Sequence, residues 1–375
     1  MSRNKTPEKL EIPFARPSFA GKEKEYLADA LSSTWVSGGP YVEKFEESFA
    51  AFHGMPYAVM TSSGTAALHL ALLGCGIGPG DEVIVPGLTF VAPINMVIAA
   101  GARPVFADVD PRTWCVDPAS VSALISDRTR AVIAVHLYGN VCDMARLSEI
   151  ASRHSLLLLE DAAEAVFSRD HGQYAGTFGD AGCFSFQATK TITTGEGGCV
   201  LTRRPELYEE MRILRDHGMT PGKRYWHEAV GYNFRLTNLQ AAVGCGQMDD
   251  LERIVARRRN IHRLYRSSLE GETGLTLQHF SSSVDPVIWA LGVKIDAAVF
   301  PQGRDALIQA LAAEGIETRP GFYPASVLPV YAAAPLPAAE DIGKSVIVLP
   351  CFPGLGDGEV EAVCAGLKGL RKGLS

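Results

Sequence analysis

The stretch SLLLLEDAAEAVFSRDHGQYAGTFGDAGCFSFQATKTITTGEGGCVLT, residues 155–202, contains the pattern that decides the fold. Four consecutive leucines follow Ser155, and a short apolar run without polar alternation is typical of a strand that is buried on both faces. Two more β-rich runs, GCFSF at 182–186 and GCVLT at 198–202, follow turn-rich segments. We therefore expect several strands of one buried sheet within this stretch.

Strand-like and helix-like segments also alternate through the preceding hundred residues. The helical patterns are TAALHLALLGCG at 65–76 and DMARLSEIASRH at 143–154. The strand-like runs are YAVMTSS (57–63), DEVIVP (81–86), ARPVFADVD (102–110) and RAVIAVHLYG (130–139). Such alternation predicts an α/β fold, in which helices cover both faces of a mostly parallel sheet.

The alternation of strand-like and helix-like segments ends near residue 235. Residues 236–270 read as one long amphipathic helix, which we expect to connect two domains. Its basic cluster Arg257, Arg258 and Arg259 is expected to be a solvated helix face. The remaining residues predict a small α+β domain, with strands in VIWALGVKI (287–295) and SVIVLP (345–350) and helices at 303–315 and 357–374. We predict a large α/β domain with an N-terminal arm at 1–245 and a small domain at 246–375.

Composition excludes several classes of protein. The 375 residues are 47% hydrophobic with a formal charge of −7 and no dense basic block, so neither disorder nor nucleic-acid binding is favoured. The eight cysteines form no CxxC pair and predict reduced thiols without a metal site. The first residues lack the apolar core of a secretory signal, and no run is long enough to span a bilayer. We expect a cytoplasmic protein.

Asp161 is the first candidate functional residue, because it stands at the carboxyl end of the leucine-rich strand. Ligands of open parallel sheets collect at that edge, and a carboxylate there can hold a cationic ring nitrogen. A structural alternative is that Asp161 only caps the next turn.

Lys190 follows 29 positions later, in a loop rich in Gly and Thr. A lysine held there by a rigid sheet can attack an aldehyde as an amine nucleophile, and GEGG at 195–198 allows close approach to a ligand. A solvated loop cation is the alternative interpretation.

A third candidate is the segment TSSGTAALHLAL at 61–72, where a strand gives way to Ser63, Gly64, Thr65 and a helix. Free N–H groups and the helix dipole make such a start a plausible phosphate site, although the GxxxxGK[ST] pattern is absent. GIGPGD at 76–81 precedes a strand and is expected to be a turn. Together, the carboxylate, the lysine and the helix start match the needs of pyridoxal 5′-phosphate (PLP).

These features lie within longer stretches that resemble a known family. The stretches are 32–50, TSSGTAALHLAL, 78–110, LEDAAEA (159–165), SFQATKTITTGEGG (185–198), GYNFRLTNLQAA (231–242) and TRPGFYP (318–324). In them the sequence is similar to the fold-type I aminotransferases of the DegT/DnrJ/EryC1/StrS group, which aminate nucleotide-linked keto sugars. The resemblance covers nearly the whole chain and implies the fold-type I architecture with PLP as cofactor.

The resemblance also implies roles for individual residues. Lys190 would bond to the cofactor aldehyde and later move protons, while Asp161 would keep the pyridine nitrogen protonated. Phe90 corresponds to the aromatic that stacks on the ring. Asn233 corresponds to a residue reaching the site from the second subunit of a homodimer. Gly64, Thr65 and Ser185 correspond to phosphate ligands, and Ser63 belongs to the same helix start.

Two positions depart from the pattern of the family. Glu164 stands where many relatives carry Gln or His beside the cofactor. If ionised, it would favour a protonated ring; alternatively, repulsion from Asp161 would raise its own pKa. Ser326 stands where relatives often have Leu-His, which puts a histidine role there in doubt.

The implied activity is ping-pong transfer of the amino group of L-glutamate, which leaves 2-oxoglutarate, to a nucleotide-linked 4-keto-6-deoxyhexose. A 3-keto sugar or a keto-sugar acid stays open as acceptor. A dehydratase of the related branch would carry histidine instead of Lys190, and a non-catalytic sensor is the remaining alternative. Side chains suited to a nucleoside diphosphate are Trp35, Arg224, Tyr225, Trp226, His227, Arg319, Phe322 and Tyr323.

Overall fold

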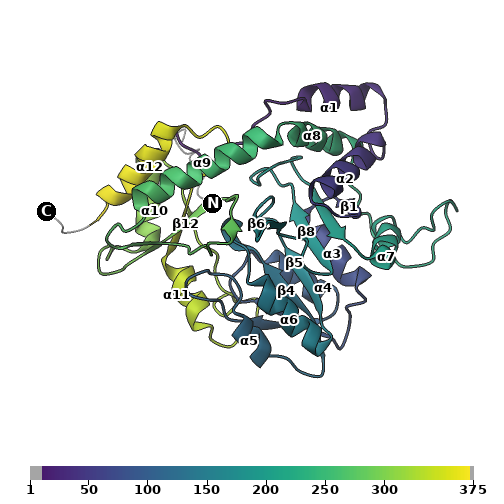
Figure 1. Ribbon diagram of the computed structural model, residues 1–375, viewed down its shortest axis with the longest axis horizontal. Coiled ribbons are helices and arrows are strands. Elements are labelled where there is room, and N and C mark those ends of the chain that lie inside the picture. The colour runs from purple at the N-terminus through teal and green to yellow at the C-terminus, as the bar shows by residue number, and fades with distance from the viewer. Residues whose placement is uncertain (1–10, 372–375) are drawn as a thin grey trace, which may run out of the picture.

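A seven-stranded sheet forms the centre of the computed structural model, which describes residues 11–371 (Figure 1). The strand order is β1-β9-β8-β5-β4-β2-β3. The seven strands are β1 (Tyr57–Thr61), β2 (Glu82–Pro86), β3 (Arg103–Ala107), β4 (Thr129–Val135), β5 (Leu157–Asp161), β8 (Ala181–Ser185) and β9 (Gly198–Thr202). Each coincides with a run that the sequence predicts as a strand, although β4 and β8 begin one residue before theirs.

The sheet is mostly parallel, as predicted. Neighbouring strands from β3 through β2, β4 and β5 to β8 run parallel, whereas β9 is antiparallel to both β8 and β1. Both faces are buried, because Leu158 packs into one apolar cluster and its neighbour Leu159 into another. Burial on two faces explains why these strands read as continuous apolar runs.

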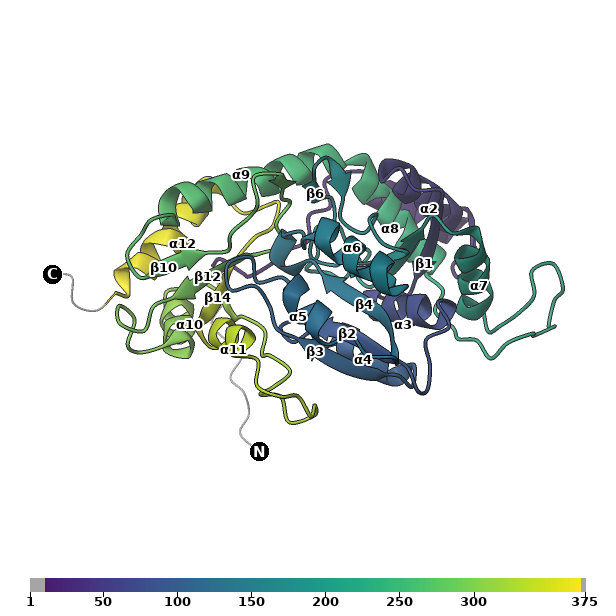
Figure 2. The ribbon, with the colours of Figure 1, turned by 60° about the horizontal axis from the view of Figure 1, so that its bottom comes forward.

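Helices cover the two faces of the sheet, as Figure 2 shows. One apolar cluster is completed by α2 (Pro40–Phe52), α5 (Pro118–Ala123), α6 (Met144–His154) and α8 (Asn238–Asp249). The other is completed by α3 (Gly64–Gly74), α4 (Ala92–Ala99) and α7 (Pro205–Arg215). Helix α1 (Glu23–Ser32) packs on α8. The expected three-layer architecture is therefore confirmed.

The helical stretch at 236–270 is two helices, which corrects the expectation of one. Helix α8 begins after a capping box between Thr237 and Gln240 and ends at Asp249, and α9 (Leu251–Leu269) follows. Asp250 between them leaves helical geometry, with ψ at 10°. Helix α8 packs against α1 and α2, whereas α9 leaves the first apolar cluster after Ile254 and enters a second one from Ile261 onward. The carboxylate of Asp250 pairs with Arg253 in the first turn of α9.

That second core belongs to the C-terminal part of the chain. Its antiparallel sheet has the order β10-β12-β14-β13, and Ile12 from the N-terminal segment forms a bridge with Ile316 beside it. Its elements are β10 (Leu275–Leu277), β12 (Leu291–Ile295), β13 (Arg319–Pro320), β14 (Val346–Leu349), α10 (Arg304–Ala313), α11 (Pro337–Ser345) and α12 (Asp357–Gly369). The run VIWALGVKI is strand only from Leu291. Helix α8 passes through the predicted 245/246 domain division, which stays a prediction.

The basic cluster on α9 differs from expectation at its middle residue. Arg257 pairs with Asp357 and Arg259 with Asp285, but Arg258 is only 1% exposed. Arg258 lies on the apolar face of α9, and its guanidinium bonds to backbone carbonyls in the interior. The expectation of a solvated face is therefore wrong for Arg258.

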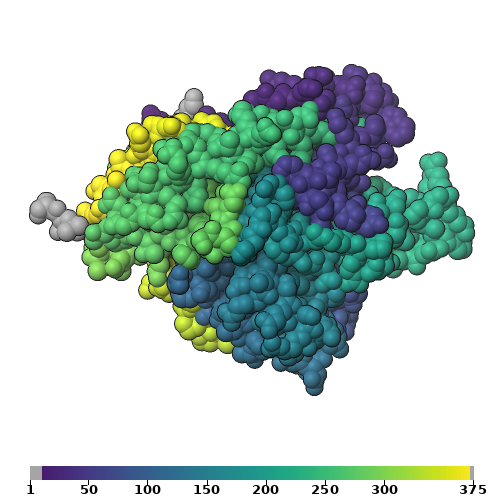
Figure 3. Space-filling view, in the orientation of Figure 1, coloured from purple at the N-terminus to yellow at the C-terminus, as the bar shows by residue number. Residues whose placement is uncertain are grey.

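The remaining elements are short. They are the 3-10 turn η1 (Leu137–Gly139) and a three-stranded sheet of β6 (Arg169–Asp170), β7 (Gln173–Tyr174) and β11 (Val284–Asp285). Between α7 and α8 the chain projects from the body of the molecule (Figures 1 and 3). Within residues 11–371, no helix combines the length and the apolar character needed to cross a membrane. The first ten residues, which open the predicted N-terminal arm, lie outside the described range.

Candidate active site

A cavity of about 450 Å³ opens at the carboxyl ends of the central parallel strands. The ends of three strands line it on the side of the sheet: Val135 of β4, Asp161 of β5 and Ser185 of β8. The start of α3 and the loop that carries Lys190 close two of its sides, and Trp289 reaches in from the segment before β12. The site thus lies at the edge where open α/β sheets bind ligands.

Asp161 is the buried carboxylate of this cavity. It is 7% exposed, and its Oδ1 accepts the N–H of Ala163 at 3.0 Å. Burial raises the pKa of Asp161, while that N–H and the charges of Lys190 and His136 act in the opposite direction. A carboxylate in this setting gains stability as an anion when a cationic N–H approaches it. The bond to Ala163 also holds the following turn, so the structural and functional interpretations of Asp161 are compatible.

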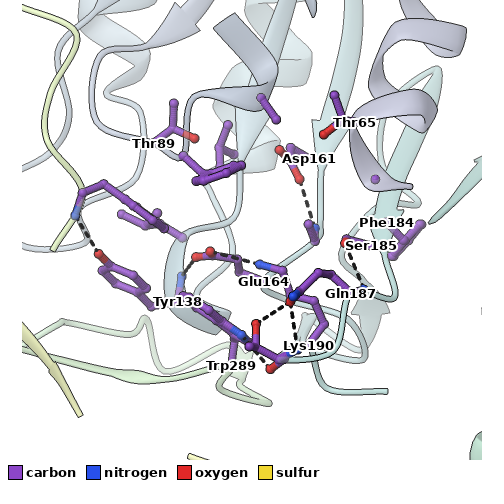
Figure 4. A pocket seen from close by; sticks show the side chains of 18 of the residues that line it. Thr65, Thr89, Tyr138, Asp161, Glu164, Phe184, Ser185, Gln187, Lys190 and Trp289 are labelled. Carbon is purple, nitrogen blue, oxygen red and sulfur yellow. Dashed lines mark hydrogen bonds and ion pairs between the residues drawn. The ribbon is translucent and has the colours of Figure 1, made fainter. Parts of the chain in front are cut away.

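Lys190 turns its ε-amine into the cavity (Figure 4). Nζ lies 3.3 Å from Oε1 of Glu164 and 4.2 Å from the ring centroid of Trp289. The loop is ordered by Gln187, whose carbonyl accepts the N–H of Lys190 at 2.8 Å and whose Oε1 accepts the N–H of Thr189. These contacts exclude the alternative that Lys190 is a solvated loop cation.

Glu164 lies directly beside Lys190. It is 5% exposed, and its Oε2 accepts the N–H of Tyr138 at 3.1 Å. Its pKa is raised chiefly by burial, with repulsion from Asp161 a lesser cause, and Lys190 and the Tyr138 N–H oppose the rise. The departure from Gln or His therefore places a buried, ionisable carboxyl group against the amine of Lys190.

The start of α3 forms the polar end of the cavity. Ser63 caps the helix by accepting the N–H of Ala66 at 3.0 Å, and Gly64 and Thr65 line the cavity at the positive end of the helix dipole. A Cβ on Gly64 would lie 2.7 Å from Cβ of Ser185, so only glycine lets the end of β8 approach this helix. The N–H groups of the helix start, together with the hydroxyls of Thr65 and Ser185, suit a phosphate.

Of the two remaining predicted site residues, Phe90 lies in the cavity and Asn233 lies outside it. Phe90 lines the cavity, is 55% exposed and has its ring centroid 6.0 Å from that of Phe322. Asn233 is exposed, forms a β-bridge with Asp216 at the end of α7, and is not part of the cavity lining. One chain therefore brings together all of the predicted site residues except Asn233.

The chain matches the profile of the DegT/DnrJ/EryC1/StrS aminotransferase family over residues 17–368. It belongs to that family. It is 41% identical over 356 residues to the GDP-perosamine synthase of Escherichia coli O157:H7, covering 94% of this chain and 96% of the relative. It is 42% identical over 361 residues to the GDP-perosamine synthase of Caulobacter vibrioides, covering 95% and 97%. The crystal structure of S. venezuelae DesV with a ketimine intermediate superposes with a TM-score of 0.89 at 37% identity, covering 94% and 95%.

This DegT/DnrJ/EryC1/StrS member is a PLP-dependent sugar aminotransferase. When bound, PLP supplies an electrophilic aldehyde and a pyridinium ring that withdraws electrons. The residues present fit it, because one cavity holds an amine, a buried carboxylate and a helix start of the kind that binds phosphate. The close approach that Gly64 allows at Ser185 is part of this fit.

Several lining residues of the aminotransferase were not predicted from its sequence. They include Tyr138, Gln187 and Trp289. Tyr138 has a positive φ of 57° and lies in the run RAVIAVHLYG, which reads simply as a strand. Of the loop candidates, Arg319 and Phe322 line the cavity, whereas Trp35, Arg224, Tyr225, Trp226, His227 and Tyr323 do not. Ser326 is also outside the lining, so nothing in this chain places a histidine role there.

Proposed function

We propose that this enzyme transfers the amino group of L-glutamate to a GDP-linked 4-keto-6-deoxyhexose. The observation that carries the reaction type is the convergence of Lys190, Asp161 and the start of α3 on one cavity. GDP as the nucleotide is supported by the two GDP-perosamine synthases that share more than 40% of their residues with this chain. A 3-keto sugar or a keto-sugar acid is the second candidate for the acceptor.

In this proposal each residue of the cavity has a separate role. Lys190 would hold the cofactor through its aldehyde, and its amine would accept the proton that leaves Cα of the amino acid. Asp161 would keep the ring nitrogen of the cofactor protonated. The phosphate would be held by Ser63, Gly64, Thr65 and Ser185, while Phe90 would cover the ring and Glu164 stays beside the amine of Lys190. In the second half-reaction the same proton movements run in reverse at the sugar carbon.

We further propose a homodimer in which Asn233 reaches the cavity of the partner subunit. Asn233 lies in the segment between α7 and α8, is exposed, and is outside the cavity lining of its own chain. Large apolar side chains are exposed in this segment and after α1, which suits burial against a second copy. They are Trp35, Val36, Tyr225, Trp226 and Val230.

We place the enzyme in the cytoplasm. All eight cysteines are free thiols and seven of them are buried, as is usual in a reducing compartment.

A substrate panel tests the proposed function. Purified enzyme with PLP is given glutamate and a set of nucleotide-linked keto sugars, and the amino sugar is detected by mass. We expect the GDP-linked 4-keto-6-deoxyhexose to react fastest. A preference for a 3-keto sugar would replace the proposed acceptor, and loss of a sugar hydroxyl without amine transfer would indicate a dehydratase.

Arg319 is expected to contact the anionic groups of both substrates. Apart from Lys190, it is the only Lys or Arg among the described residues that line the cavity. Its guanidinium lies 4.2 Å from the ring centroid of Phe14 and 3.3 Å from Glu317. Glutamate and the sugar diphosphate occupy the same cavity in turn, so both need this cation.

Arg319→Met should therefore raise KM for glutamate and for the nucleotide sugar by about tenfold or more, because a hydrogen bond to a charged group is worth about 1.5–3 kcal/mol. The value of kcat should change little. Arg212→Met, which removes a surface arginine paired with Glu209, is the control. An unchanged KM for both substrates would contradict the assignment.

A further inference from the structure

The ε-amine of Lys190 has an aromatic neighbour that comes from a distant part of the chain. The ring of Trp289 lies with its centroid 4.2 Å from Nζ, and its indole Nε1–H donates to the carbonyl of Thr189 at 2.9 Å (Figure 4). Trp289 is 8% exposed, so the contact is largely shielded from water. The same tryptophan therefore touches both the side chain of Lys190 and the backbone of the residue before it.

The ring of Trp289 is held in one orientation. It is stacked with Tyr138, at 6.2 Å between centroids and 15° between planes, and with Phe322, at 6.4 Å and 7°. Phe14 packs against it edge-on at 5.7 Å and 71°. Aromatic contacts of this kind contribute beyond their buried area, and here they leave the indole little freedom to rotate.

Arg258 ties this tryptophan to the catalytic loop. Its Nη1 donates to the carbonyls of Ile288 at 3.1 Å, Trp289 at 3.0 Å and Cys351 at 3.2 Å. Its Nη2 donates to the carbonyl of Lys190 at 3.3 Å. One guanidinium thus joins the backbones on either side of the Lys190 and Trp289 contact.

The burial of Arg258 is costly. The side chain is fully enclosed, and burial lowers its pKa. Within residues 11–371 its hydrogen-bond partners are four backbone carbonyls and the sulfur of Cys351, with no carboxylate among them. A buried cation without a counter-ion is destabilising unless its donors are satisfied. An apolar side chain could fill the same space without this cost. The hydrogen bonds from Arg258 to the carbonyls of Lys190 and Trp289 therefore need a separate explanation.

We propose that Trp289 is a positioning residue for the amine of Lys190 and that Arg258 fixes the two relative to each other. When Lys190 takes a proton from Cα of the substrate, positive charge develops on Nζ. The face of the indole and the carboxylate of Glu164 then attract that charge. This inference rests on the proposed role of Lys190 as the proton carrier.

Kinetics of the glutamate half-reaction test the role of Trp289. Trp289→Leu should slow the half-reaction by about 10- to 30-fold, the scale of a desolvated cation–π contact, with KM for glutamate within about twofold. Deuterium at Cα of glutamate should give a larger isotope effect than in the wild type, because proton removal becomes the slow step. Trp289→Phe keeps a ring and should lose less. An unchanged rate and isotope effect in Trp289→Leu would overturn the proposal.

Chemical rescue separates positioning from a merely structural role. In Lys190→Ala, proton transfer can be restored by a small amine such as methylamine in solution. Trp289→Leu should have no further effect on this rescued rate, because the amine that Trp289 positions is then absent. An equal loss in the rescued reaction would show that Trp289 only supports the cavity and would overturn the proposal. High turnover of Lys190→Ala without added amine would instead remove the proposed function itself.

A spectroscopic measurement tests Arg258 without relying on turnover. Full-length enzyme, with its cofactor converted to the amine form by glutamate, is reductively dimethylated on lysine with ¹³C-formaldehyde and a borane reductant. The Lys190 resonance, assigned by its loss in Lys190→Ala, should be shifted upfield by the ring of Trp289. Arg258→Lys and Trp289→Leu should move it toward the position of exposed lysines, whereas Arg259→Met, which removes the adjacent surface ion pair with Asp285, should not. An unchanged shift in Arg258→Lys and in Trp289→Leu would contradict the proposal.

Discussion

Lys190→Ala is expected to abolish transamination, lowering turnover by about 10⁴-fold or more, because the same side chain acts as nucleophile and as proton carrier. The yellow colour of the lysine-bound cofactor should disappear as well. The fold should survive, since the amine makes one ion pair, with Glu164, and a cation–π contact with Trp289. Glu164 can take up a proton when its partner is lost, because burial already raises its pKa.

The measurement combines absorbance, steady-state kinetics and covalent trapping. Borohydride treatment of the wild-type enzyme should fix the cofactor on the peptide that contains Lys190. Lys294→Ala is a matched control, because Lys294 also forms an ion pair, with Asp341, but lies in the small sheet away from the cavity. Near-normal transamination by Lys190→Ala, or an adduct on another lysine, would remove the assignment.

The large sheet could be predicted from the sequence because its strands are buried on both faces. Leu158 and Leu159 enter opposite apolar clusters, which leaves a continuous leucine run in the sequence. The antiparallel direction of β9 could not be predicted, because direction depends on the path of the chain rather than on residue type. The break at Asp250 is not visible in the sequence either, since both sides of it are good helical sequence and the break is known only from the backbone angles of that residue.

The candidate site also has a part that local sequence patterns predict and a part that they do not. Asp161, Lys190 and the start of α3 lie in segments with recognisable local patterns, and the structure places them around one cavity. Trp289 is 99 positions from Lys190, and within the run VIWALGVKI it reads as an ordinary core aromatic. Contacts between such distant segments leave no local pattern.

Arg258 did leave a signal that could have been used. Buried Ile254, Ile261 and Tyr265 lie on one side of α9, and Arg258 follows Ile254 by four positions and precedes Ile261 by three. This spacing places Arg258 on the apolar face. A charged residue in that phase needs polar partners in the interior, so helical phase is more informative here than the adjacency of three arginines.

Asp161→Asn should slow removal of the α-proton by about 10²–10³-fold, the scale seen when one stabilising contact to a transition-state charge is removed. Asparagine can still accept the N–H of Ala163, which leaves the local backbone unchanged. It carries no charge, however, and so it cannot keep the ring nitrogen protonated as a carboxylate does. Binding of the cofactor phosphate at the start of α3 should change little, so the loss should be in rate rather than in cofactor content.

The half-reaction with glutamate, followed by stopped-flow absorbance, measures this step directly. Asp180→Asn provides the control. Asp180 precedes β8, and its Oδ2 accepts the N–H of Leu158 at 2.9 Å near the amino end of β5, the strand that carries Asp161 at its other end. A carboxylate at that end is far from the carboxyl edge and should leave the rate within about twofold of the wild type. If Asp161→Asn also reacted at a near wild-type rate, another group would have to protonate the ring. Besides Asp161, the described residues that line the cavity include two acidic ones, Glu164 beside Lys190 and Glu196 in the loop that follows. A further loss of rate when Glu164→Gln is added to Asp161→Asn would identify Glu164 as that group.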